Sequence, residues 1–363
     1  MELVVRQGHN GLDEVFDDWA NLFDSQRNPS PPASPYWWDA LLGSLEYRRQ
    51  DTWNVFCVYE NGTLLAAIPA FMVKERIFGV YTRVLTVPCH GFYGDALLPD
   101  SLASDALWRL LRTLDDSKNR WDLYRCMNVP DTSPLRQIDE SNGRVLQIPN
   151  QYRVWLPAGN IEERFRFSSS KYRSNLRRRE RLLNECGEWS IQCVRANSRD
   201  NQALDEFFDL EHSGWKGREG TSIRARPDQE EFLRRLAMGY RRGSGVGVCL
   251  LHLRGQTIGG VLLLFDGDTV RVPKVAYDEA FGRFSPVQKL IEYVAGTHEE
   301  LAIDMISDAP WMKPWGPRTS VVSNVLVAGP TLIGRTLLHS MKVRTHIMRP
   351  TARLIRNTFR RNQ

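Results

Sequence analysis

No long hydrophobic run is present in this sequence. Its longest apolar stretches, residues 246–251 and 258–265, have the length of strands, whereas a transmembrane helix needs roughly 20 consecutive apolar residues. The first residues also lack the basic stretch followed by an apolar one that marks a signal peptide. We therefore predict a cytoplasmic protein, with peripheral association as the one form of membrane contact left open.

Cysteine pairs of the kind that bind metal ions are also absent. There is no CxxC pair and no Cys/His pair at metal-ligand spacing. The six cysteines lie singly along the chain, at Cys57, Cys89, Cys126, Cys186, Cys193 and Cys249. We predict that they are core thiols in a reducing compartment, and we expect no metal cofactor.

Acidic residues are missing from the C-terminal segment 331–363, which carries eight Lys and Arg. The net charge of the whole chain is only +5, so the remainder of the chain is close to neutral. Apolar residues alternate with the basic ones, which predicts a helical tail that binds an anionic membrane surface. Alternatively, these apolar residues pack on the protein body while the arginines face water.

Hydrophobic periodicity divides the rest of the chain into two units that meet near residue 160. Residues 1–160 alternate strands with helices, and the helices are expected at 12–23, 36–45 and 102–114. A hairpin is expected from strands 53–59 and 64–73, because Asn61-Gly62 suits the positive φ angles of a tight hairpin turn.

The second unit, residues 161–330, begins with a predicted helix from Ile161 to about Cys186, which Gly187 ends. Strands and helices then alternate, and short strands at 301–305 and 321–327 close the unit. The sequence thus predicts an α/β fold of two similar halves. Each half is a mixed sheet flanked by helices, and the basic helical tail, 331–363, follows.

Four segments of the second unit combine charged, aromatic and glycine residues. The first, residues 168–179, is strongly basic, and its Lys171 and Arg173 predict either an anion-binding surface or a solvated helix face. The second, residues 210–221, places Trp215, Lys216 and Arg218 among three glycines, which predicts a ligand clamp or a packed loop at a helix end.

The third segment, residues 274–290, runs from a strand end through a loop into a helix that begins at Ser285-Pro286. The free amides at such a helix start attract phosphate groups, although an ordinary connection also fits the pattern. The fourth segment, residues 304–315, holds Lys313 between prolines and aromatic residues. That lysine is either functional or simply exposed in a turn.

Taken in this order, the four segments resemble the CelD-like branch of the GNAT superfamily. They are more distantly similar to the FemABX aminoacyl-tRNA-dependent transferases. The resemblance covers residues 167–315 and implies a tandem GNAT-like fold. It also implies transfer of an acyl group from acyl-CoA, such as acetyl-CoA, to an amine or hydroxyl acceptor. The usual glycine-rich CoA motif is absent.

The resemblance implies roles for particular residues. Lys313 would stabilise the oxyanion. Glu211 and Asp278, with Asp304 behind them, would act as general bases unless they only pair with Lys216 or Lys274. The CoA pyrophosphate would lie on Ser285, Pro286, Val287 and Gln288. Substrate-binding residues would be Trp215, Lys216, Arg218, Lys274, Tyr277, Lys171 and Arg173.

Two other functions remain open from the residues. The donor could be an aminoacyl-tRNA, in which case the basic helix and tail would contact RNA phosphates. A protein that kept the fold but lost catalysis could instead bind a partner or a membrane. The set of Glu211, Lys216, Lys274, Asp278 and Lys313 favours an enzyme.

Overall fold

The computed structural model describes residues 2–26, 29–44, 52–87, 92–98, 120–138, 140, 143–165, 168–196, 201–239, 245–312, 315 and 319–345. Within them, one twelve-stranded sheet has the order β1-β2-β3-β4-β5-β12-β6-β11-β10-β9-β8-β7. It is a mixed sheet, because β4 pairs in parallel with β5 and β10 with β11 while the other pairs are antiparallel.

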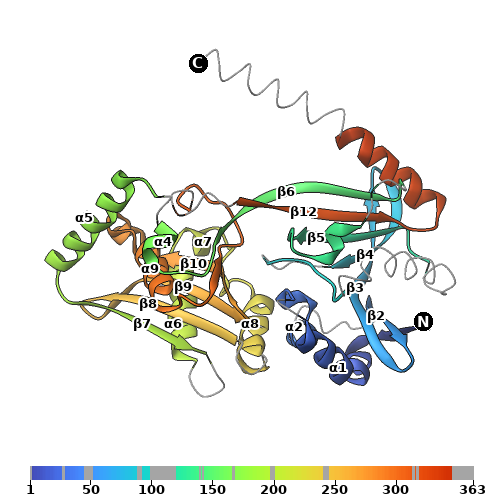
Figure 1. The fold of residues 1–363 in the computed structure, drawn as a ribbon, viewed down its shortest axis with the longest axis horizontal. Coiled ribbons are helices and arrows are strands. Elements are labelled where there is room, and N and C mark those ends of the chain that lie inside the picture. The colour runs from blue at the N-terminus through green and yellow to red at the C-terminus, as the bar shows by residue number, and fades with distance from the viewer. Residues whose placement is uncertain are drawn as a thin grey trace, which may run out of the picture.

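The N-terminal half is the part of the sheet on the right of Figure 1. Its strands are β1 (Glu2–Gln7), β2 (Trp53–Glu60), β3 (Thr63–Ile77), β4 (Val80–Val87), β5 (Leu123–Val129), β6 (Val145–Leu156) and β12 (Thr319–Ala328). The helices are α1 (Gly8–Ser25) and α2 (Pro35–Leu42), with 3-10 turns at Pro31–Ala33 and Pro134–Gln137. Asn61 and Gly62 both have positive φ between β2 and β3, which confirms the predicted hairpin. The helix expected at 102–114 lies outside the described residues.

The C-terminal half continues the same sheet on the left of Figure 1. Its strands are β7 (Trp189–Arg195), β8 (Gly245–Leu253), β9 (Gln256–Asp266), β10 (Thr269–Tyr277) and β11 (Ala302–Asp304). Its helices are α4 (Ile161–Phe165), α5 (Ser170–Cys186), α6 (Gln202–Ser213), α7 (Trp215–Arg218), α8 (Pro227–Gly239) and α9 (Pro286–Thr297).

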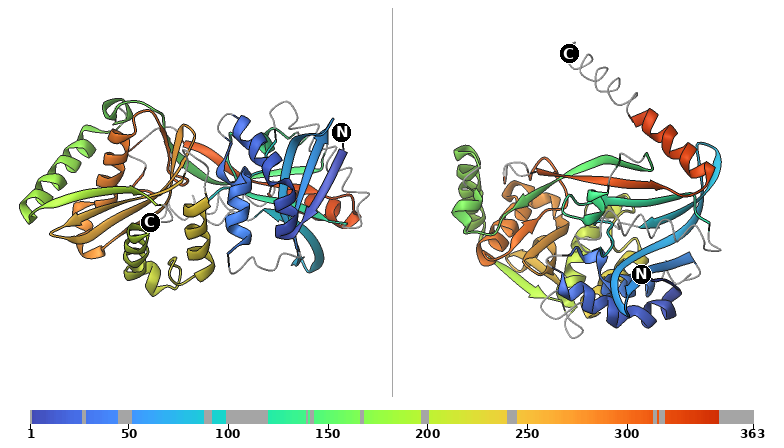
Figure 2. Two further views of the ribbon diagram at one scale, coloured as in Figure 1. Left: turned by 90° about the horizontal axis from the view of Figure 1, so that it is seen from below. Right: turned by 45° about the vertical axis from the view of Figure 1, so that its right-hand side comes forward.

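Helices lie on both faces of the C-terminal half of the sheet (Figure 2). Two adjacent glycines of β9 let two of these helices approach the sheet closely. A Cβ atom at Gly259 would lie 2.5 Å from the Cβ of Pro286, the first residue of α9. A Cβ atom at Gly260 would lie 2.8 Å from the Phe207 ring of α6. Since successive residues of a strand point to opposite faces, α9 and α6 cover the two sides of this half.

The single helix predicted from Ile161 to Cys186 is wrong, because the structure has two helices there. Ser169 begins α5 by accepting a hydrogen bond from the Tyr172 amide, which is the role that serine prefers at a helix start. Arg164, at the end of α4, donates to the carbonyl oxygens of Ala295 and His298. Gly187 ends α5, as predicted, with a φ of 133°.

Two long strands connect the halves (Figure 1). β12 lies between β5 and β6, so the expectation that residues 321–327 close the C-terminal unit is wrong. The far end of β6 crosses in the other direction, because Trp155 and Leu156 pair with Asp304 and Ile303 of β11. Each half therefore contains a strand from the other part of the chain.

A helix at residues 332–345 follows β12. Leu337 and Leu338 are buried, and Leu338 joins a cluster formed with Val84, Leu123 and Leu326 of the sheet. For these two leucines, the alternative that the apolar residues of the tail pack on the protein body is therefore confirmed. Residues 346–363, which carry the rest of the predicted basic tail, lie outside the described part of the chain. In the described part, no helix is long and apolar enough to span a bilayer.

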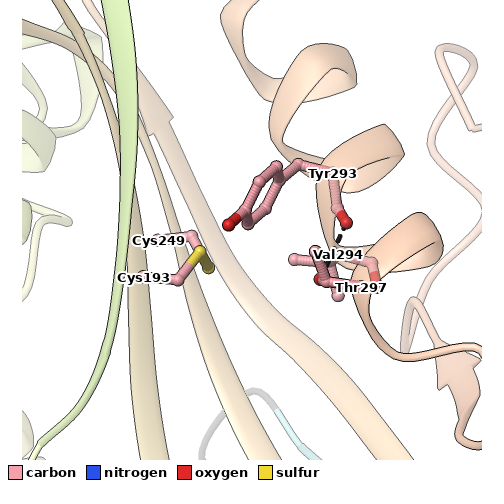
Figure 3. Close-up of a disulfide and its surroundings, with 5 residues drawn as sticks. All are labelled: Cys193, Cys249, Tyr293, Val294 and Thr297. Atoms are coloured by element: carbon pink, nitrogen blue, oxygen red, sulfur yellow. Dashed lines mark hydrogen bonds between the residues drawn. A yellow bond between two sulfur atoms is a disulfide. The ribbon is translucent and has the colours of Figure 1, made fainter.

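Cys193 and Cys249 form a disulfide across β7 and β8, where they are directly opposite each other (Figure 3). The prediction that all cysteines are core thiols is therefore wrong for this pair. The sequence could not show it, because the two residues are 56 positions apart and become neighbours only through strand pairing. Cys57, Cys126 and Cys186 are not part of a disulfide.

We expect alkylation of the denatured, unreduced protein to modify Cys57, Cys126 and Cys186 but not the disulfide pair. Peptide mass spectrometry should find Cys193 and Cys249 alkylated only after treatment with a reductant. If Cys193 and Cys249 are both alkylated without reductant, whether the protein is purified under nitrogen or in air, the disulfide does not form.

Candidate functional site

The strands β10 and β11 are paired over a short length and then separate. Their parallel register covers Thr269–Arg271 on β10, and its last pair is Arg271 with Asp304. The next part of β10 shifts register and continues with β9 from Lys274 on. The chain after β11 follows β6 instead, through hydrogen bonds between Val154 and the backbone of Met305 and Ser307. Beyond Arg271, β10 thus lacks a strand neighbour on that side among the described residues.

The start of α9 lies next to this opening. β10 continues through a 3-10 helix, η6 (Glu279–Phe284), to Ser285, which has a left-handed φ of 54°. Pro286 has no N–H, and no described group accepts a hydrogen bond from the amides of Val287 and Gln288. Free amides and the positive end of the helix dipole meet here, and the predicted anion site depends on this feature.

On the opposite face of the sheet, Glu211 of α6 is the centre of a buried polar cluster. Its side chain is almost completely buried. One carboxylate oxygen accepts a hydrogen bond from Lys216 Nζ at 2.7 Å, and the other accepts from the Ile223 amide at 2.8 Å. Lys216 Nζ also donates to the carbonyl oxygen of Val275 on β10, at 3.1 Å. The ion pair therefore fastens α6 and α7 to the strand that borders the opening.

Lys274 precedes Val275 in this part of β10. Its ammonium group forms no ion pair or hydrogen bond with any residue in the described part of the chain. Burial lowers the pKa of Lys274, and the cations Lys216 and Arg226 lower it further, against the opposite effect of Glu211. The cluster thus contains one lysine that is paired and one that is not.

The predicted clamp residues lie beside this cluster, on the surface. Arg218 forms two hydrogen bonds to Glu279 of η6, at 2.9 and 2.8 Å, and the Trp215 amide donates to the same carboxylate. The Trp215 ring is half exposed. Gly217 is required, because a Cβ atom there would lie 1.7 Å from the carbonyl oxygen of His212. Arg218 is therefore already paired in this structure.

The remaining predicted residues do not all come together. Asp278 caps η6 by accepting from the Ala280 amide, and Gln256 donates to its other oxygen. Tyr277 is exposed at the end of β10, and Lys171 is exposed on α5. Lys313 lies outside the described residues, although its neighbour Trp315 is buried.

Arg173 lies at a cavity between α4, α5 and α9. The cavity has a volume of about 440 Å³, with apolar and charged side chains in its lining: Ile161, Phe165, Leu176, Arg173, Arg177 and Glu292. Arg173 also donates hydrogen bonds to the carbonyl oxygens of Phe165 and Ser168. Burial raises the pKa of Glu292.

A second buried polar cluster joins the two halves. Asp304, at the end of β11, is completely buried and accepts from the Tyr93 hydroxyl at 2.8 Å and from Arg153 Nη1 at 2.7 Å. The Ile306 amide donates to the same carboxylate, and Ile306 has a left-handed φ of 59°, which is rare for a β-branched residue. Arg271 of β10 lies 3.9 Å away.

Arg153 of β6 extends this cluster toward the N-terminal half. It also donates to Asp131 at 2.7 Å and to Ser320 of β12 at 2.5 Å. Burial alone would lower the pKa of Arg153, but the Asp304 and Asp131 carboxylates outweigh it and raise that pKa. Burial, and then the charge of Asp304, raises the pKa of Tyr93. Tyr93 and Arg153 were not among the predicted site residues, because their partner is 211 and 151 residues away in the sequence.

Comparisons with known proteins agree with this architecture. Residues 170–305 match the family described as the acetyltransferase (GNAT) domain, so the resemblance to the GNAT superfamily is confirmed for the C-terminal half. The match supports a transferase. No curated protein matches the chain.

Several solved structures share the fold over most of the chain. The crystal structure of FemX is 14% identical with a TM-score of 0.57, over 90% of this chain and 97% of that chain. A conserved protein of unknown function from Bacteroides thetaiotaomicron is 10% identical with a TM-score of 0.52, over 87% and 97%. L-PGS from Bacillus licheniformis is 8% identical with a TM-score of 0.50, over 93% and 98%. At these identities the likeness concerns the fold alone.

We expect Asp304→Asn to lower the free energy of unfolding by about 3–5 kcal/mol, because it removes the buried carboxylate that pairs with Arg153 and leaves the partly exposed Asp131 as the remaining ion-pair partner of this buried cation. Urea unfolding followed by fluorescence measures this. Glu14→Gln, which breaks the exposed ion pair with Arg6, is the matched control and should cost under about 1 kcal/mol. Equal effects of the two substitutions would contradict a structural role for the Asp304 cluster.

Proposed function

We propose that this protein transfers an acyl group from acyl-CoA to an amine or hydroxyl acceptor. The observation that carries the proposal is the separation of β10 from β11. The opening between these strands is bordered by chemically different groups on the two faces of the sheet. One face presents the start of α9, and the other presents the cluster of Glu211, Lys216 and Lys274. A thioester placed in the opening would thus be reached from both sides.

The donor would bind on the α9 face. The unpaired amides of Val287 and Gln288, with Ser285 and Pro286 before them, would hold the pyrophosphate in place of a glycine-rich loop. The close approach of Pro286 to Gly259 fixes this helix start against the sheet. Acetyl-CoA is the simplest such donor, and the length of the acyl chain is not part of the proposal.

The acceptor would bind on the α6 face, near Trp215, Lys216 and Tyr277. Attack on the thioester creates an oxyanion, which needs a hydrogen-bond donor. By its resemblance to FemABX proteins, Lys313 is the proposed donor. Glu211 and Asp278 remain candidates for the base, but both oxygens of Glu211 are already occupied, which supports the pairing alternative.

The wider assignment rests on the same resemblance. We propose a CelD-like enzyme of polysaccharide, lipid or natural-product biosynthesis. The basic residues 346–363 would bring it to an anionic membrane surface. An aminoacyl-tRNA donor remains the alternative, with no observation that favours it over acyl-CoA.

Isothermal titration of acetyl-CoA into the full-length protein tests the donor site. Ser285→Glu should weaken binding by at least about tenfold, because a carboxylate would repel the pyrophosphate at the helix start. Ser285→Gln adds a side chain of the same size without charge and should weaken binding less. Equal affinities for the two variants would remove this helix start from the donor site, and no binding by the wild type would reject acyl-CoA as the donor.

A further inference from the structure

Lys274 occupies a distinctive place on β10. It is the first residue after the register shift that ends the pairing with β11, so it borders the opening between the two strands. Ala276, two residues further along the strand, packs in the core on the α6 side. Residues two apart share a face of a strand, and the charges that act on Lys274 accordingly come from the α6 side.

The charges around Lys274 are one carboxylate and two cations. Glu211 from α6 is the one carboxylate among them, and it is fully engaged by Lys216 and the Ile223 amide. Lys216 from α7 and Arg226 from the segment before α8 are both cations. Burial and the two cations lower the pKa of Lys274, so it loses its proton more readily than an exposed lysine, and the neutral nitrogen carries a free lone pair.

We propose that Lys274, which borders the opening and has no hydrogen-bond partner among the described residues, is the general base of the acyl transfer. This proposal rests on the proposed function. The acceptor N–H or O–H gives its proton to Lys274 Nζ while its nitrogen or oxygen bonds to the thioester carbonyl carbon. When the C–S bond breaks, the leaving thiolate takes that proton from the Lys274 ammonium. The lysine is neutral again after each turnover, and no other reactant is needed.

The other titratable groups of the site are less suited to this task. Both oxygens of Glu211 already accept hydrogen bonds, and Lys216 holds Glu211 and Val275 together. Asp278 is engaged in capping η6 and in a hydrogen bond from Gln256. Glu211, Lys216 and Asp278 are each engaged in hydrogen bonds that hold the structure together, so none of them is available as a base.

The first experiment measures the protonation of Lys274 without any substrate. Trace labelling of the native protein with acetic anhydride over a pH series, read by peptide mass spectrometry, gives the midpoint of lysine reactivity. Lys274 should reach half of its maximum at a lower pH than the exposed Lys171. Lys216→Met should raise the midpoint, because a cation is lost and Glu211 becomes unpaired; Glu211→Gln should lower it. A midpoint equal to that of Lys171 would overturn the proposal.

The second experiment uses acetyl-CoA as donor and hydroxylamine as acceptor, with the uncatalysed rate subtracted. Lys274→Gln and Lys274→Arg should both lower kcat roughly 10²–10⁴-fold, because neither side chain can accept the proton. In the wild type, kcat/KM should rise with pH, and this rise should be absent in both variants. Exposed Lys74→Arg is the control.

The two experiments separate the outcomes. If Lys274→Arg retains activity, Lys274 contributes only charge or packing, and the general-base proposal fails while the proposed function stands. If the wild type neither binds acetyl-CoA nor forms acetylhydroxamate, the proposed function fails, and the base proposal with it. A low midpoint together with the loss of kcat in both variants supports the proposal.

Discussion

The buried carboxylate of Asp304 is the interaction on which the rest of the structure depends. Removing a charge from water costs several kcal/mol, and a buried carboxylate is tolerated only when its partners are complete. Here Asp304 belongs to the C-terminal half and both side-chain partners come from the N-terminal half, Tyr93 from a loop and Arg153 from β6. Because Asp304 ends β11 where β10 departs, satisfying this charge also fixes the point at which the two strands separate.

The halves are joined by apolar packing as well as by this charge. The rings of Trp37 on α2 and Phe232 on α8 lie 4.8 Å apart, so helices of the two halves are in direct contact. With β6 and β12 crossing between the halves, the α6 face of the C-terminal sheet is held against the N-terminal half (Figures 1 and 2). The sheet is continuous across the two halves. The domain boundary at residue 160 therefore remains a proposal.

Local features of this architecture could be predicted from the sequence, and features that depend on distant residues could not. The hairpin at Asn61-Gly62, the end of α5 at Gly187 and the start of α9 at Pro286 follow from turn and capping chemistry within a few residues. The place of β12, the disulfide and the Asp304 cluster depend on strand pairing across the chain. In the site, Glu211 and Lys216 are five residues apart and their pairing was foreseen, whereas the isolation of Lys274 follows from the fold.

The central claim is that the donor thioester lies in the opening between β10 and β11, with the acceptor side facing Lys274. A crystal structure of the full-length protein with a non-hydrolysable acetyl-CoA analogue tests it most directly. We predict the pyrophosphate at the amides of Val287 and Gln288, and the acyl carbonyl between residues 272–277 of β10 and residues 305–307. An analogue bound instead in the cavity between α5 and α9, with the opening between the strands vacant, would contradict the account.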